Sequence, residues 1–186
     1  PPAQPANPDA PPGEPAAPDV VPEVQPTPQQ QALLDIAAGV DTLDELRSTE
    51  QLVFNLDGGE LTSEIVDAMQ DLTNLRGIDI TGSLHPSDLD AMRNLPQSID
   101  RVSINGPRQL DLSALENLSN LENLELYHFR MFTVDNAKAL PTSVRKLRLV
   151  SARRLLPEAA SILHQKGVES IYAPNVIDEP VEGYER

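Results

Sequence analysis

The sequence predicts an α/β fold in which short parallel strands and helices alternate as stacked repeats. Three observations indicate this fold. A pattern spaced as apolar-x-x-apolar-x-apolar recurs six times, and its alternating positions are typical of a strand with one buried face. The segment after each copy changes to helical spacing. One strand and one helix cannot bury their apolar faces alone, so neighbouring copies are expected to stack.

The six copies are nearly evenly spaced. They begin at residues 51, 75, 99, 121, 144 and 168, which are 24, 24, 22, 23 and 24 residues apart. A period of roughly 20–29 residues is the one that leucine-rich repeats show. The clearest copies are LRGIDI at 75–80, IDRVSI at 99–104, LENLEL at 121–126 and VRKLRL at 144–149, flanked by the weaker QLVFNL at 51–56 and VESIYA at 168–173. We therefore expect a solenoid of about six repeats with short parallel strands on its concave side.

Helices are expected on the convex side of this array. Helical spacing predicts them over residues 62–72, 87–95, 112–118, 134–140 and 157–165. Ser87-x-x-Asp90 and Ser113-x-x-Glu116 fit the capping-box pattern that begins a helix. Pro157 suits a first helical position, because proline has no backbone N–H to leave unpaired there.

Four regions are expected along the chain. Residues 1–28 hold 11 of the 18 prolines and few apolar side chains, which predicts a disordered Pro/Ala-rich arm. Residues 29–48 have helical spacing interrupted at Gly39 and Asp41, which predicts two short helices that cap the first repeat. The repeats occupy 49–174, and 175–186 is predicted to be an acidic tail.

Two repeats are led by the segments Leu95-Pro96-Gln97-Ser98-Ile99 and Leu140-Pro141-Thr142-Ser143-Val144. The chain resembles the leucine-rich-repeat superfamily over about 48–174, and these segments are similar to the Leu-Pro lead-in of effectors that pathogenic bacteria inject by type III secretion. The resemblance implies a secreted protein that is delivered into a host cell and binds a host protein. In some such effectors the repeats are the substrate-recognition part of an E3 ubiquitin ligase.

The chain departs from the family at the position eight residues after each repeat start. The family usually places an asparagine there, and its side chain ties successive turns together. The residues found here are Gly59, Ser83, Pro107, Phe129, Ala152 and Val176. No asparagine ladder is therefore expected.

The composition argues against several classes of function. A net charge of −15 disfavours general binding to nucleic acid, and no apolar stretch approaches the roughly 20 residues that cross a bilayer. The absence of cysteine removes disulfides, thiolate metal sites and thiol nucleophiles from these residues. His85, His128 and His164 lie in different repeats without metal-ligand spacing. We expect no catalytic residues, no metal and no cofactor, hence no enzyme.

The charges are unevenly distributed. Residues 31–129 contain 5 Lys/Arg and 18 Asp/Glu, whereas residues 130–166 contain 8 Lys/Arg and 2 Asp/Glu. The array is therefore expected to be acidic at one end and basic at the other. Such asymmetry orients a partner of the opposite pattern, and it also suits head-to-tail self-association.

The partner-binding site is expected on the concave face, where strand side chains that alternate with the buried ones point outward. Tyrosine and arginine are favoured anchors in protein interfaces. In the segment 127–132, Phe129 and one of Met131 or Phe132 are expected in the core, which leaves His128 among the exposed residues. The expected contacts are Asp79, Arg101, Asn123, Glu125, Tyr127, Arg130, Lys146, Arg148 and Tyr172.

Three functions follow from these observations. The first is a module of a secreted bacterial effector that binds a host protein through the concave face. The second is the substrate-recognition domain of a larger E3 ubiquitin ligase whose catalytic part lies beyond Arg186. The third is a structural repeat protein that self-associates. Another protein is the expected partner in each case, without nucleic acid and without insertion into a membrane.

Overall fold

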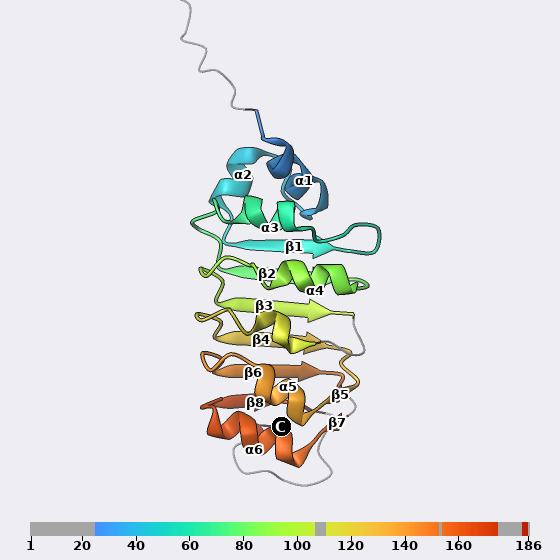
Figure 1. Ribbon diagram of the computed structural model, residues 1–186, viewed down its shortest axis with the longest axis vertical. Helices are drawn as coiled ribbons and strands as arrows, with labels where there is room; N and C mark the ends of the chain where they lie inside the picture. The colour runs from blue at the N-terminus through green and yellow to red at the C-terminus, as the bar shows by residue number, and fades with distance from the viewer. Residues whose placement is uncertain (1–24, 107–110, 153, 175–183, 186) are drawn as a thin grey trace, which may run out of the picture.

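The computed structural model describes residues 25–106, 111–152, 154–174 and 184–185 (Figure 1). The predicted arm falls outside the described residues up to residue 24. The predicted tail also falls outside them, except for Tyr184 and Glu185. The described part is an α/β fold with a parallel sheet, as predicted.

The sheet is built in the order of the sequence. Each strand pairs in parallel with the next strand of the sheet along the chain, and the strands lie one below another along the longest axis of the molecule (Figure 1). Every copy of the apolar pattern forms a strand, which confirms the strand prediction. The strands are β1 (Gln51–Asn55), β2 (Gly77–Thr81), β3 (Arg101–Asn105), β4 (Asn123–Tyr127), β6 (Lys146–Val150) and β8 (Ser170–Tyr172).

The register of the first strand differs from the prediction. The sequence pattern aligned Phe54 with Ile78, but Leu52 pairs with Ile78 and Phe54 with Ile80. The first repeat therefore begins two residues earlier, at residue 49. A shift of two residues keeps the same side chains buried because the strand period is two, so the apolar pattern alone does not distinguish the two registers.

Helical segments connect successive strands of the sheet. Four of the five predicted helices are α-helices, whereas the third is a single 3₁₀ turn. The 3₁₀ turn lies in the repeat that begins at residue 99, which is the shortest at 22 residues and has the least chain for the return crossing. The elements are α3 (Ser63–Met69), α4 (Pro86–Met92), η1 (Leu112–Leu115), α5 (Val134–Ala139) and α6 (Pro157–Gln165).

Two predicted helix starts are wrong. Helix α4 begins at Pro86, and its capping carboxylate is Asp88, which accepts a hydrogen bond from the His85 amide at 2.6 Å. Proline's fixed φ suits the first helical position, so the helix starts before Ser87. The η1 turn is capped by Asp111, which accepts from the Ser113 amide at 2.9 Å. Helix α6 begins at Pro157, as predicted.

Side chains connect neighbouring strand–helix units at positions other than the family's asparagine position. Asn74 and Asn120, each directly before a repeat, donate to the carbonyl oxygens of Arg47 at 3.1 Å and Gln97 at 2.7 Å in the preceding unit. The Ser143 hydroxyl donates in the same way to the Leu118 carbonyl at 3.2 Å. These bonds join the loops of successive units through backbone carbonyl groups.

Asp88 makes a further connection between units. Its side chain is completely buried, and its second oxygen accepts a hydrogen bond from the Leu61 amide at 2.7 Å. One carboxylate thus binds two backbone amides, one from its own unit and one from the unit before. Two N–H groups are satisfied in this way, and that of Leu61 is buried, which offsets the cost of burying the polar side chain.

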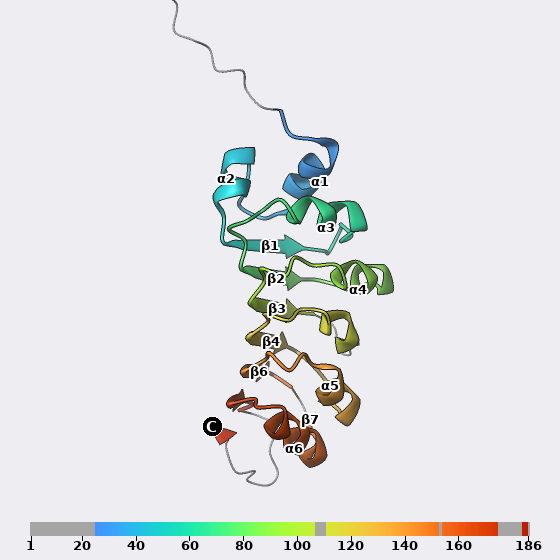
Figure 2. The same cartoon turned by 60° about the vertical axis from the view of Figure 1, so that its left-hand side comes forward.

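The core lies between the sheet and the helices. Helices α3, α4, α5 and α6 cover one side of the strands, and no described helix covers the opposite side (Figure 2). Phe129 and Phe132 are buried with ring centroids 6.1 Å apart, whereas Met131 is 37 % exposed, as the sequence predicts. We call the uncovered side of β1–β8 the open face, and it carries the strand residues that alternate with the buried ones.

Both edges of the sheet have a backbone neighbour. Before β1 lie helices α1 (Pro28–Ile36) and α2 (Leu43–Ser48), as predicted, and the Ala38 amide donates to the Val53 carbonyl at 2.7 Å. At the other edge, β9 (Tyr184–Glu185) pairs with β8 in parallel. The short strands β5 (Met131–Phe132) and β7 (Arg154–Leu155) pair separately, beside the main sheet.

Candidate functional site

The predicted contact residues lie where alternation places them. All except Arg130 belong to the open face, and Arg130 follows β4 directly. None of the nine is buried, whereas the intervening Leu124, Leu126, Leu147 and Leu149 are at most 1 % exposed. The sequence therefore assigned these side chains to the correct side of the sheet.

A row of contacts crosses three strands of the open face. Glu125 of β4, Arg148 of β6 and Tyr172 of β8 are direct neighbours in the register. Glu125 Oε1 lies 3.9 Å from Arg148 Nη1, and the guanidinium carbon of Arg148 lies 5.1 Å from the centre of the Tyr172 ring. The Tyr127 hydroxyl donates to Glu125 Oε2 at 2.6 Å. We call Glu125, Tyr127, Arg148 and Tyr172 the Arg148 cluster.

The Tyr127 hydroxyl is held in its protonated form. Its hydrogen bond to Glu125 raises the pKa of Tyr127, and burial and the charge of Glu125 act in the same direction. A phenol with a raised pKa remains a neutral donor at physiological pH. Glu125 is therefore anchored through one oxygen, and only its other oxygen faces Arg148.

A depression of about 400 Å³ lies beside this row. Asn123, Lys146 and Ser170 are neighbours across the same three strands and form its second row. Leu124 and Leu147 also line it. The depression thus presents two cations, an amide, a hydroxyl and an aromatic ring, with one carboxylate that is already engaged.

Six of the nine predicted contacts belong to the Arg148 cluster and the row beside it, and the other three lie outside these rows. Of the three, Arg101 is the direct register neighbour of Asn123, and the charge of Asp79 contributes to the raised pKa of Tyr127. Asp79 lies on β2 and accepts a hydrogen bond from Gln51 at 2.5 Å. Within the described ranges, no hydrogen bond or ion pair joins Arg101 or Arg130 to the Arg148 cluster. Ser170 was not among the predicted contacts, although its position before Tyr172 on the same side of β8 was a usable signal.

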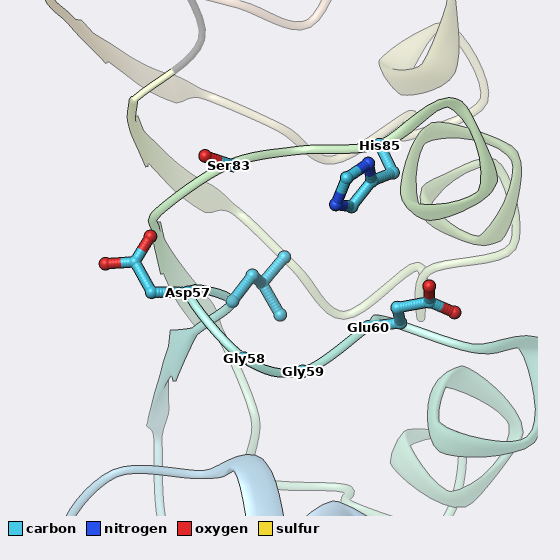
Figure 3. A pocket seen from close by; sticks show the side chains of 7 residues that line it. Asp57, Gly58, Gly59, Glu60, Ser83 and His85 are labelled. Atoms are coloured by element: carbon cyan, nitrogen blue, oxygen red, sulfur yellow. The ribbon is translucent and has the colours of Figure 1, made fainter.

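A second hollow of about 450 Å³ lies at the ends of β1 and β2 (Figure 3). Loop residues line it: Leu56, Asp57, Gly58, Gly59, Glu60, Ser83 and His85. In Figure 3 the Asp57 carboxylate and the Ser83 hydroxyl point away from the His85 ring, so these groups are not arranged as a nucleophile with its base. The Arg148 cluster has the mutual contacts that this hollow lacks, and it is the stronger candidate.

Neither a metal cluster nor a membrane span marks the part of the chain that the structure describes. No group of three or more His, Cys, Asp and Glu side chains is placed to hold a metal ion there. Among the same residues, no helix combines the length and apolar character needed to cross a bilayer.

The comparisons with known proteins leave the family open. No family model matches this chain, and no curated protein matches it in sequence. The candidate site therefore rests on the geometry of the open face.

Proposed function

We propose that this chain is a leucine-rich-repeat solenoid that binds another protein through the open face. The sequential order of the sheet supports the solenoid. Each of the first five of the six strands pairs with the next one, 22–26 residues later, with a helical segment between them. Parallel strands on one side and helices on the other are the arrangement that stacked leucine-rich repeats take.

The Arg148 cluster is the observation that carries the binding proposal. Two tyrosines and an arginine, which are residue types enriched among interface anchors, stand together on an uncovered sheet face. Their mutual contacts restrict their rotamers before a partner arrives. Such preorganisation reduces the conformational entropy that binding would otherwise cost.

A protein is a better ligand for this surface than a small molecule. Small-molecule sites are usually enclosed, whereas this depression lies open on a sheet face. Most of its lining residues are polar or charged, although more of its exposed surface is apolar than polar. Polar surfaces with a few aromatic and arginine anchors are typical of interfaces between proteins that also exist separately. In this proposal the chain performs no catalytic step of its own.

The Leu-Pro lead-ins support a narrower proposal, in which the chain belongs to a secreted bacterial effector and binds a host protein. Pro96 and Pro141 are both buried, and their carbonyl oxygens accept hydrogen bonds from Ile99 at 3.1 Å and Val144 at 3.3 Å. Each lead-in thus forms the turn into the repeat that follows. The same lead-ins suit the recognition domain of a larger ubiquitin ligase. A catalytic domain encoded after Arg186 in the reading frame would support that alternative.

Affinity capture from host-cell lysate tests the proposal. We expect wild-type protein to retain a partner that the double variant Lys146→Glu, Arg148→Glu does not. The control is the double variant Arg47→Glu, Lys138→Glu, which changes net charge equally on exposed helix residues. Equal capture by the two variants would move the site off the open face. Circular dichroism establishes that both are folded, and light scattering of wild-type protein tests the self-association alternative.

A further inference from the structure

We infer that the depression beside the Arg148 cluster binds a carboxylate of an acidic peptide segment of the partner. This inference rests on the proposed function and adds the chemistry of the ligand. The decisive feature is that Arg148 is oriented by its neighbours but only weakly neutralised by them.

The existing ion pair of Arg148 leaves most of its donors available. Glu125 Oε1 lies 3.9 Å from Nη1, whereas charge-assisted hydrogen bonds are about 2.7–2.9 Å long. The two side chains are 50 % and 31 % exposed, so water also weakens their attraction. The other oxygen of Glu125 is engaged by the Tyr127 hydroxyl at 2.6 Å. An incoming carboxylate can therefore form a better pair with Arg148 than Glu125 does.

Tyr172 contacts the Arg148 guanidinium that would form this pair. The guanidinium carbon lies over the Tyr172 ring, 5.1 Å from the ring centre, which is a cation–π contact that helps to orient Arg148. A cation–π contact uses none of the N–H groups as hydrogen-bond donors to an oxygen, so they remain available for a two-point contact with a carboxylate. This geometry favours a planar two-oxygen ligand over a point charge.

Lys146 supplies the second positive charge. It precedes Arg148 by two residues on β6, points to the same face and is exposed. Within the described ranges, no acidic side chain forms an ion pair with its ammonium. Its cross-strand neighbours Asn123 and Ser170 carry no charge, so this row of the depression has no carboxylate of its own to repel a ligand.

The position of the depression on the sheet determines where acidic residues of the ligand are tolerated. Segment 130–166, which includes β6, has 8 Lys/Arg against 2 Asp/Glu. In residues 31–129 the acidic strand residues are Asp79 on β2 and Glu125 on β4, so an acidic ligand would meet the Asp79 carboxylate over β2. Charges separated by more than about 8 Å are largely screened at physiological ionic strength. The acidic residues of the ligand are thus expected over β6 and β8 and not over β1 and β2.

Fluorescence anisotropy with labelled synthetic peptides tests this inference. The probes are a short glutamate-rich peptide and the same peptide with glutamine at every glutamate. We expect wild-type protein to bind the glutamate peptide, with affinity that falls as salt rises, and to bind the glutamine peptide at least about tenfold more weakly. Equal binding of the two peptides, or no binding of the glutamate peptide, would overturn the inference.

Four substitutions locate the carboxylate. Arg148→Gln is expected to weaken binding about tenfold or more, and Arg148→Lys is expected to weaken it too, because lysine retains the charge without the planar fork. Glu125→Gln is expected to strengthen it, because a competing carboxylate is removed. Lys138→Gln on α5 removes the same charge outside the open face and is expected to have no effect. Equal weakening by Arg148→Gln and Lys138→Gln would show binding by net charge alone, and unchanged affinity in Arg148→Gln would place the binding elsewhere. Either outcome would refute the site.

The acidic ligand can be refuted while the proposed binding face stands. Capture of a partner that depends on Lys146 and Arg148, without binding of the glutamate peptide, would refute the acidic ligand and leave the binding face in place. Stronger binding of single-stranded RNA than of the glutamate peptide at the same site would also refute it, since phosphate would then be the preferred anion. Failure of both experiments would refute both proposals.

Discussion

Asp88 Oδ1 accepts a hydrogen bond from the Leu61 amide at 2.7 Å across the boundary between two strand–helix units. The same carboxylate accepts from the His85 amide at 2.6 Å through its other oxygen. A single completely buried side chain therefore begins helix α4 and fastens the loop after β1 to it. This bond connects units near the acidic end of the sheet, far along the chain from the Arg148 cluster.

Replacing Asp88 by alanine is expected to lower the free energy of unfolding by about 3 kcal/mol, because the buried Leu61 amide and the part-buried His85 amide lose their acceptor. Urea unfolding followed by circular dichroism measures the change. Asp90→Ala, on the exposed side of the same helix, is the control and is expected to change it by less than about 1 kcal/mol. Equal effects of the two substitutions would contradict the role given to Asp88.

The aliphatic row beneath the open face is expected to supply a large part of the stability. Leu124→Ala and Leu147→Ala each remove a side chain that is at most 1 % exposed, at a cost of about 2–5 kcal/mol. Asn123→Ala, on the opposite side of β4, is expected to cost about 0.5 kcal/mol or less. Thermal and urea unfolding measure the stability of the three variants. A small loss of unfolding free energy in the leucine variants would mean that this aliphatic row is poorly packed.

The corners after the strands adopt backbone conformations that favour glycine. Ser151 follows β6 with a φ of 58°, and Gly106 follows β3 with a φ of 144°. Ser151→Gly is expected to raise stability by up to about 1 kcal/mol, because the left-handed region is unfavourable for a residue with a Cβ. Gly106→Ala is expected to lower it, since the new Cβ would collide with the Gly82 carbonyl oxygen. Chemical unfolding measures the change in the free energy of unfolding for both variants. A change of the same sign in both would contradict the conformational preference given to these corners.

The hydrogen bond between Tyr127 and Glu125 is expected to make stability depend on pH at alkaline values. Because the pKa of Tyr127 is raised in the folded protein, its contribution is fully present below the unfolded value near 10.0. It is lost as pH rises through the higher folded pKa. The free energy of unfolding of wild-type protein should thus fall more steeply above pH 10 than that of Tyr127→Phe. A parallel decline in the two proteins would mean that the bond does not form in solution.

Ultraviolet titration of the phenols provides a direct control for this prediction. In a Tyr172→Phe, Tyr184→Phe background, Tyr127 is the remaining tyrosine of the chain. Its pKa is expected to fall when Glu125 is replaced by glutamine, because the negative acceptor that favours the protonated phenol is lost. An unchanged titration curve would place the cause of the shift elsewhere.

The sequence by itself determined the strands, the helices and the side of the sheet on which each strand residue lies. This was possible because apolar alternation is a local property, and burying one face of a strand sets the direction of every other side chain. The outward positions of Lys146 and Arg148 and the burial of Phe129 and Phe132 were predicted on this basis. Only the third helix differed in kind, since the shortest repeat has room for a single 3₁₀ turn.

Only the tertiary structure decided which of these residues meet. Local alternation is unchanged by a two-residue shift, so the register that pairs Leu52 with Ile78 required the packed sheet. The contacts of Asp88 with Leu61 and of Arg148 with Glu125 and Tyr172 join residues 23–27 positions apart. Such contacts depend on how neighbouring units stack, because side chains far apart in the chain meet only after the strands have paired.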